Sequence, residues 1–184
     1  MIRCFLSLNI ERSLQNKLSY AQEDLKKELS SQKIKWEKAD KFHLTLRFLG
    51  DTEPGKIKII SQELTGLKLG FEVISMTASG IGFFPNAKKP NVVFIALNED
   101  GNSTGILVDE IDRALGKFGF KPDFKFVPHI TMGRFRRDNR VKIEHAINVK
   151  IEPFEFKFDS FYLMKSKLKP GGSDYEVIKE FKFK

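Results

Sequence analysis

The chain has 184 residues, 41% of them hydrophobic, which is enough to bury one sizeable core without disulfides or structural metals. Its formal net charge is +8, from 32 Lys and Arg against 24 Asp and Glu, and this excess favours an anionic partner such as nucleic acid. Its apolar runs are far shorter than the roughly 20 residues of a membrane helix, its N-terminus lacks a signal-peptide pattern, and its single cysteine has no internal disulfide partner. We therefore expect a cytoplasmic protein that does not contact a membrane.

The first part of the chain predicts two strands, each followed by a helix. Ile2–Ile10 alternates apolar and polar residues, and Glu11–Ser30 repeats apolar residues at spacings of three and four. After a short stretch at Ile34–Trp36, a second strand contains His43 and ends at Gly50. Pro54 then lies near the start of a helix that runs to about Lys68.

The middle of the chain predicts two more strands, Phe71–Ser79 and Asn91–Leu97. The segment between them, Gly80–Pro90, is rich in glycine, proline and lysine, so we predict a loop or hairpin end there. Asn102–Phe118 reads as a helix. The side chains expected on its buried side are Ile106, Ile111, Leu115 and Phe118.

The last third begins with a strand that contains His129, after Pro128, and a short helix is predicted over Arg140–Asn148. Two strands follow, Phe154–Met164 and Tyr175–Phe183, joined by a glycine-containing loop. This order of elements predicts an α+β fold with a largely antiparallel sheet. No segment reads as a linker, so we expect residues 1–184 to form a single domain.

A four-residue pattern occurs twice, as His43-Leu44-Thr45-Leu46 and as His129-Ile130-Thr131-Met132, in a chain with only three histidines. Successive side chains of a strand point to opposite faces, so each histidine shares a face with the threonine two residues later. The two copies are separated by about half the chain. We therefore expect two pseudo-symmetric lobes of mostly antiparallel sheet, helices on the outside, and both histidines in a central cleft.

Two histidines can supply the base and the acid that attack at phosphorus needs without a metal. The hydroxyls of Thr45 and Thr131 can donate hydrogen bonds to the oxygens of a phosphate. By strand parity, Arg47 continues the face of His43 and is a candidate phosphate contact. Arg134 has the opposite parity from His129, so it reaches the cleft only if its strand bends or bulges after Gly133.

The histidines could also have a purely structural role or bind a metal. A single His-x-Thr tripeptide in a strand is more often a solvent-facing or hydrogen-bonded histidine, but two copies in matching contexts favour chemistry. His145 has no such context, and we expect it to have a surface or packing role. Neither motif is accompanied by the cysteines or carboxylates of a zinc site, so we expect no metal and no cofactor.

The chain resembles the 2H phosphoesterase superfamily, named for its two His-x-Thr/Ser-x (HXTX) motifs, and within it the RNA 2′,3′-cyclic phosphodiesterases, also called 2′-5′ RNA ligases. The resemblance extends over most of the chain. The segments that carry it are Arg3–Leu8, Trp36–Gly50, Gly82–Asn86, Phe126–Arg134 and Leu163–Tyr175.

This resemblance implies a bilobed enzyme that opens the 2′,3′-cyclic phosphate of an RNA end, such as a tRNA half, to a 2′-phosphomonoester. His43 would be the proton donor to the departing 3′ oxygen, and His129 the proton acceptor that activates water. The family also places an arginine at the position of Arg134, which implies that the strand bends there. The reverse reaction would join RNA ends by a 2′-5′ linkage. We expect a monomer.

Two alternatives remain open at this point. The chain could be a non-catalytic nucleotide- or RNA-binding module, although such a module has no need of both histidines and both threonines. It could also be a phosphodiesterase for small cyclic nucleotides, although the basic charge favours a longer polyanion. Phe83, Phe84 or Tyr162 could stack a base, but aromatic side chains more often belong to the core.

Overall fold

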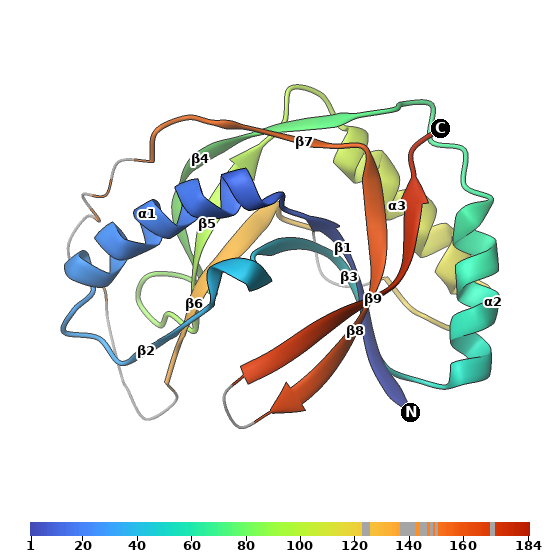
Figure 1. The fold of residues 1–184 in the computed structure, drawn as a ribbon, viewed down its shortest axis with the longest axis horizontal. Helices are drawn as coiled ribbons and strands as arrows, with labels where there is room; N and C mark the ends of the chain where they lie inside the picture. Colours follow the sequence, from blue (N-terminus) through green and yellow to red (C-terminus); the bar gives the residue numbers. More distant parts are fainter. Residues whose placement is uncertain (123–125, 137–142, 144–146, 148, 150, 170–171) are drawn as a thin grey trace.

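The computed structural model describes residues 1–122, 126–136, 143, 147, 149, 151–169 and 172–184. In these residues nine strands form one curled antiparallel sheet with three α-helices outside it (Figure 1). The strands are β1 (Ile2–Asn9), β2 (Ile34–Trp36), β3 (His43–Thr52), β4 (Ile74–Phe84), β5 (Val92–Asn98), β6 (His129–Phe135), β7 (Glu155–Phe158), β8 (Ser160–Lys169) and β9 (Gly172–Lys182). The helices are α1 (Arg12–Glu28), α2 (Pro54–Thr65) and α3 (Ser103–Gly116), with a 3-10 turn η1 at Ala39–Lys41. The predicted α+β class is confirmed.

The strand order is β7-β4-β5-β6-β3-β1-β8-β9, and β2 pairs with β6 beside this row. The row divides into two lobes, β7, β4, β5, β6 and β2 on one side and β3, β1, β8 and β9 on the other (Figure 1). A single register pair, Leu44 of β3 with Ile130 of β6, joins the lobes. Because this pair lies inside both histidine motifs, the junction of the lobes is also the place where the motifs meet.

Helix α1 covers the lobe opposite to the strand that precedes it, whereas α2 stays with the lobe of the strand that precedes it (Figure 1). Helix α1 follows β1 in the chain but contacts the other lobe, since the buried Gln22 amide donates to the carbonyl of Met132 in β6 at 2.9 Å. Helix α2 lies against β9, where the Lys179 ammonium donates to the Thr65 hydroxyl at 2.8 Å. Helices α1 and α2 therefore lie behind the sheet and leave its inner face accessible.

Each helix forms because its apolar residues recur on one face. In α1 these are Leu14, Leu18 and Leu25, all buried. In α3 the buried face includes Ile111 and Leu115 as predicted. Ile106 is 43% exposed, so that part of the prediction is wrong, and its neighbours carry the buried face instead. All three helices are a few residues shorter at their C-termini than the sequence suggested.

Two predicted strand boundaries are corrected by the sheet. The segment Gly80–Phe84, expected in a loop or hairpin end, continues β4 and pairs with β5, and a register shift after Ala78 accommodates it in the ladder. The predicted strand Phe154–Met164 is two strands. It breaks at Asp159, where β7 leaves β4 in one lobe and β8 begins beside β1 in the other.

The core consists of the apolar faces of both lobes and their helices, with Leu6, Leu44, Ile95 and Ile130 all fully buried. Cys4 is buried too, and burial raises the pKa of its thiol, which fits an inert core residue. Within the described residues, none of the helices is long and apolar enough to span a bilayer. The predicted helix over Arg140–Asn148, and His145 with it, fall largely outside those residues.

Candidate active site

The two motifs present their histidines in the same way. In β3 the side chains of Leu44 and Leu46 are buried, whereas His43 and Thr45 are partly accessible on the other face. In β6 Ile130 and Met132 are buried, and His129 and Thr131 are partly accessible. The alternation expected from the sequence is therefore present in both strands.

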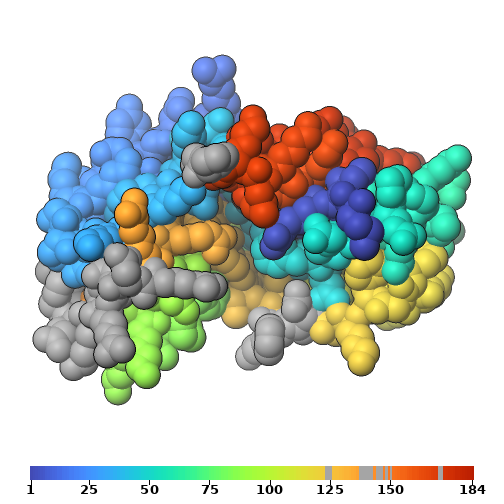
Figure 2. Space-filling view, turned by 90° about the horizontal axis from the view of Figure 1, so that it is seen from below, coloured from blue at the N-terminus to red at the C-terminus, as the bar shows by residue number. Residues whose placement is uncertain are grey.

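Both motifs line one cleft of about 550 Å³, a size typical of a small-molecule or nucleotide site. Figure 2 shows the hollow between the lobes, with β6 on one side of it and the N-terminal end of β1 on the other. Because β3 and β6 run antiparallel through the pair Leu44 and Ile130, an approximate twofold axis passes between the motifs. His43 and His129 are thus related by this axis across the cleft.

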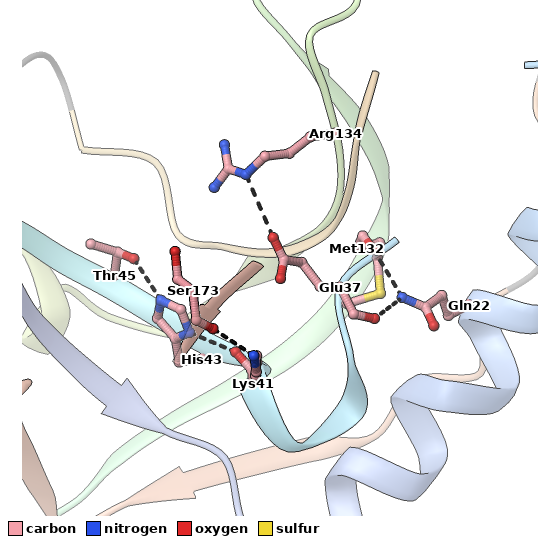
Figure 3. Close-up of polar contacts among 8 residues, drawn as sticks. All are labelled: Gln22, Glu37, Lys41, His43, Thr45, Met132, Arg134 and Ser173. Atoms are coloured by element: carbon pink, nitrogen blue, oxygen red, sulfur yellow. Dashed lines mark hydrogen bonds and ion pairs between the residues drawn. The ribbon is translucent and has the colours of Figure 1, made fainter. Parts of the chain in front are cut away.

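Each histidine makes an equivalent hydrogen bond to a backbone carbonyl two residues earlier. His43 Nδ1 lies 2.7 Å from the carbonyl oxygen of Lys41, and His129 Nδ1 lies 2.7 Å from that of Val127. A carbonyl oxygen only accepts, so Nδ1 carries the proton in both rings and Nε2 is the nitrogen left for chemistry. In His43 this Nε2 lies 3.1 Å from the hydroxyl of Thr45 (Figure 3).

Burial lowers the pKa of both imidazoles below the ordinary histidine value. The hydrogen bonds to Lys41 and Val127 oppose this effect, whereas the positive charge of Arg134 lowers both pKa values further. His129 also lowers the pKa of His43, so the two rings influence each other electrostatically. Neutral imidazoles are therefore favoured near neutral pH, and a proton placed on either one is more acidic than usual.

Aromatic rings account for much of this burial. The ring centroid of His43 lies 5.1 Å from that of Phe5 and 5.2 Å from that of Tyr175, which it meets edge to face. The ring centroid of His129 lies 4.8 Å from that of Phe84 and 5.2 Å from that of Phe94, and both contacts are edge to face. Each imidazole is thus fixed by a hydrogen bond from Nδ1 and by two rings from other strands, and His43 also by its contact with Thr45.

A bulge follows the threonine in both motifs and changes the parity of the strand. In β6 the register with β5 passes from Thr131 directly to Gly133, so Met132 is the extra residue. Arg134 therefore lies on the cleft face, as the predicted bend requires, and lines the cleft. In β3 the register with β1 passes from Thr45 to Arg47, so the extra residue is Leu46.

This second bulge makes the parity argument for Arg47 wrong. Its side chain is 5% exposed and faces away from the cleft, and its Nε lies 3.1 Å from Oδ1 of Asp112 in α3. Arg47 does not line the cleft, so the prediction that it contacts a phosphate is wrong. The residue that faces the cleft in its place is Phe48, which is 59% exposed.

Glu37 and helix α1 fix the position of Arg134 beside the cleft. Arg134 Nε lies 3.5 Å from Oε1 of Glu37, which also lines the cleft (Figure 3). The backbone of Glu37 is fixed in turn, because its N–H donates to the carbonyl of Met132 and its own carbonyl accepts from the buried Gln22 amide at 2.8 Å. Arg134 is therefore held by a carboxylate whose position α1 determines.

The opposite wall is the hairpin of β8 and β9, which is tied to His43 through Lys41. The Lys41 ammonium donates to the carbonyl of Ser173 at 2.5 Å, and the Lys41 carbonyl accepts from His43 (Figure 3). The same ammonium donates to Asp174 at 3.0 Å. Burial raises the pKa of the Tyr175 phenol on the same strand, and nearby Glu37 adds to this, so the hydroxyl stays protonated as a donor.

Sequence reasoning missed Glu37, Lys41, Phe48 and Tyr175 as residues of the cleft. None of them belongs to the His-x-Thr tetrapeptides, although all four lie in segments that resemble the phosphodiesterases, Trp36–Gly50 and Leu163–Tyr175. Of the aromatic residues considered for base stacking, Phe84 does line the cleft, against His129. Phe83 and Tyr162 do not line it, and the Tyr162 hydroxyl hydrogen-bonds Glu180 instead.

The cleft is thus equipped for proton transfer at an anionic centre. It offers two Nε2 atoms for acid and base, two threonine hydroxyls as donors and one arginine charge. Among the described residues, no group of three or more His, Cys, Asp or Glu side chains is arranged to hold a metal ion. That the reaction needs no metal stays a prediction.

Comparison with known proteins places this geometry in context. The profile of the family described as LigT like Phosphoesterase matches residues 8–94 and 100–173. A protein of Methanocaldococcus jannaschii named RNA 2′,3′-cyclic phosphodiesterase is 32% identical over 98% of this chain and 100% of its own length. A Thermotoga maritima protein of the same name is 31% identical over 99% of this chain and 96% of its own.

Solved structures show the same fold. A crystal structure of a Thermus thermophilus protein superposes with a TM-score of 0.79 at 23% identity, covering 99% of this chain and 98% of that one. The crystal structure of Escherichia coli LigT complexed with 3′-AMP gives a TM-score of 0.76 at 19% identity, covering 99% of this chain and 98% of that one. The curled two-lobed sheet is therefore a shared architecture.

Proposed function

The chain belongs to the LigT-like phosphoesterases, a two-histidine family, and from this premise we propose that it is an RNA 2′,3′-cyclic phosphodiesterase. Its substrate in this proposal is an RNA end that carries a 2′,3′-cyclic phosphate, such as a tRNA half, and its product is a 2′-phosphomonoester. The observation that carries the proposal is the matched hydrogen bond from each Nδ1 to a backbone carbonyl, which leaves both Nε2 atoms for proton transfer.

In the proposed mechanism His129 acts as the base and His43 as the acid. A water molecule attacks phosphorus while its proton passes to Nε2 of His129, and the bond from phosphorus to the 3′ oxygen breaks. His43, protonated at Nε2, gives its proton to that oxygen, which becomes a 3′-hydroxyl. The lowered pKa of His43 makes it the stronger acid that a departing alkoxide needs.

The charge that develops on the non-bridging oxygens would be stabilised by three groups. Thr45 and Thr131 lie on the faces of the histidines and can donate from their hydroxyls. Arg134 carries a positive charge at the cleft and is 55% exposed, so its guanidinium can turn from Glu37 toward a phosphate. An anion bound at this point would raise the pKa of His43 and so favour its protonated form.

The orientation of the substrate is supported by a difference between the lobes. Arg134 and Phe48 occupy the same place after the two bulges, five residues beyond each histidine, and both face the cleft. One lobe therefore offers a cation at this position and the other offers an exposed aromatic ring. We propose that the phosphate lies toward Arg134 and the nucleoside toward Phe48.

The same groups would serve the reverse reaction, in which a 5′-hydroxyl attacks the cyclic phosphate and the two histidines exchange roles. We propose hydrolysis as the main activity and 2′-5′ ligation as its reversal. The proposed working unit is a cytoplasmic monomer in which residues 1–184 form one domain. One continuous sheet across both lobes supports the single domain.

The test is to incubate the protein, in EDTA, with an oligoribonucleotide that ends in a 2′,3′-cyclic phosphate and to identify the terminal phosphate by ³¹P NMR. We expect a 2′-phosphate, and we expect His43→Ala and His129→Ala each to lower kcat by about 10²- to 10⁴-fold. His145→Ala is the matched control, because it removes the histidine outside the motifs. Activity that survives in both motif variants would refute the mechanism, and tight binding without turnover would indicate a recognition module.

A further inference from the structure

Arg134 is the inner end of a row of cations that continues out of the cleft. It pairs in register with Lys35 of β2, and one step further along the N–H of Arg136 donates to the carbonyl of Lys33 at 3.0 Å. Side chains that lie opposite each other in an antiparallel pair share a face, and so do residues two apart in a strand. Lys33, Lys35, Arg134 and Arg136, here called the basic row, therefore extend the cleft face outward, and all four are exposed.

Among the described residues, the charges at the centre of the basic row have few carboxylate partners. Like charges directly opposite in a sheet destabilise it, and Lys35 lies directly opposite Arg134. Glu37 pairs with Arg134, but in the part of the chain that the structure describes no carboxylate forms an ion pair with Lys35 or Arg136. An arrangement of this kind is stabilised when an external anion lies across it.

The basic row also begins at the rim of the catalytic cleft. Gly172, the first residue of β9, lies close to β2, because a Cβ built on it would lie 3.7 Å from the ammonium of Lys35. Lys35 thus stands where the two lobes meet at the mouth. From Arg134 to Arg136 the strand rises about 6.6 Å, a spacing of the order of one nucleotide of backbone.

We propose that the basic row binds the phosphodiester backbone of the RNA strand that precedes the terminal nucleotide. This inference rests on the proposed function, because it takes Arg134 to contact the terminal phosphate and runs the strand outward from there. Lys35 and Arg136 then contact preceding phosphates, which adds affinity for a longer RNA without reading its sequence. The consequence is a preference for oligonucleotide ends over mononucleotides.

The experiment compares two substrates that end in the same nucleoside 2′,3′-cyclic phosphate, the free mononucleotide and a ten-nucleotide RNA. The variant is Lys35→Gln/Arg136→Gln, which removes two charges without reversing any beside Arg134. The matched control is Lys58→Gln/Lys68→Gln, which removes two exposed lysines associated with the other lobe. For each protein the ratio of kcat/KM, long over short, is measured at several salt concentrations.

We expect the ratio to fall by about tenfold in the Lys35/Arg136 variant and to stay at the wild-type value in the control. The slope of log kcat/KM against log salt for the long substrate should become shallower by about 1.4, at about 0.7 for each phosphate contact of a single strand. An unchanged ratio in the Lys35/Arg136 variant, or a wild-type enzyme without preference for the longer RNA, would overturn the inference. A loss shared equally by both substrates would overturn it as well.

Failure of the proposed function is visible separately, because the wild-type protein would then fail to open even the mononucleotide. In that case, binding of RNA to the basic row is measured by fluorescence anisotropy of a labelled ten-nucleotide RNA that ends in a 2′-phosphate. Weaker binding by the Lys35/Arg136 variant than by the lysine control would support the row, and equal binding would refute it. If poly-glutamate of matched charge displaces the RNA as well as unlabelled RNA does, the row is a surface for acidic proteins and the RNA assignment is wrong.

Discussion

Arg47 of β3 and Asp112 of α3 form an ion pair behind the sheet, with Nε and Oδ1 3.1 Å apart and the arginine side chain only 5% exposed. The pair joins the strand that carries the first histidine to a helix that covers it. It lies on the opposite face from the cleft, so it concerns the stability of the lobe and does not touch the substrate.

We expect Arg47→Ala to lower the free energy of unfolding by about 3–5 kcal/mol, because it removes one member of a largely buried ion pair. The kcat/KM of the folded enzyme should remain close to wild type. Urea denaturation and activity at low temperature measure the two effects. In the double variant Arg47→Met/Asp112→Leu, which removes both charges, much of the stability should return. A large loss of kcat/KM in the stable double variant would restore Arg47 as a substrate contact.

Gly133 occupies the place in β6 that Arg47 occupies in β3, and here β2 lies against the strand. A Cβ at Gly133 would come 2.6 Å from Cγ2 of Ile34 and 3.0 Å from Cε3 of Trp36. We expect Gly133→Ala to destabilise the protein by about 1–3 kcal/mol through overpacking and to displace β2, which carries Lys35. Thermal unfolding measures this. Gly116→Ala is the control, because a Cβ there meets nothing within 4 Å, and equal stability of the two variants would contradict the prediction.

The lowered pKa values of His43 and His129 make stability depend on pH. The unfolded chain keeps its histidine pKa near 6.5, so just below that pH it binds more protons than the folded chain. The contribution is therefore fully present above about pH 6.5 and is lost as pH falls toward the folded values. Unfolding in urea at about pH 7.5 and 5 should show a steeper loss for wild type than for His43→Gln/His129→Gln. Identical pH dependence would show that the two rings do not titrate as the structure implies.

Catalysis should have its own pH dependence, because the proposed mechanism needs one neutral and one protonated histidine. The pair titrates in two coupled steps, both displaced below the ordinary value of about 6.5. We expect a bell-shaped profile of kcat/KM, which reports the free enzyme, with its maximum on the acidic side of pH 6.5. A maximum above pH 7.5 would mean that another group supplies the acid.

The Thr45 hydroxyl lies 3.1 Å from Nε2 of His43, where it can orient the ring and then donate to the phosphate. We expect Thr45→Val to lower kcat by about 10²-fold, the usual loss for one donor to a developing oxyanion, with the fold intact. Thr45→Ser keeps the hydroxyl and should retain most of the activity. Steady-state kinetics with circular dichroism as a fold check decide the point. Thr131→Val is the equivalent change on β6, and its effect should be comparable because the motifs are related by the twofold axis.

The sequence by itself determined the three helices, most of the strands and the pairing of a histidine with a threonine in each motif. The repeated His-x-Thr alternation placed His43 and Thr45, and equally His129 and Thr131, on one face of a strand, because side-chain parity is a local property of extended backbone. Leucine spacing likewise predicted α1 to within two residues at its C-terminal end. The matching burial of the two motifs follows from the same local rule.

Tertiary structure decided what lies beyond the motifs. A bulge depends on how a strand pairs with its neighbours, so parity from the sequence was valid as far as Thr45 and Thr131 and failed at Arg47. The bulge in β6 brought Arg134 into the cleft, and the bulge in β3 turned Arg47 away from it. Lys41 and Tyr175 became part of the site only because distant strands pack against His43, and contacts between residues more than a hundred positions apart leave no periodic pattern in the sequence.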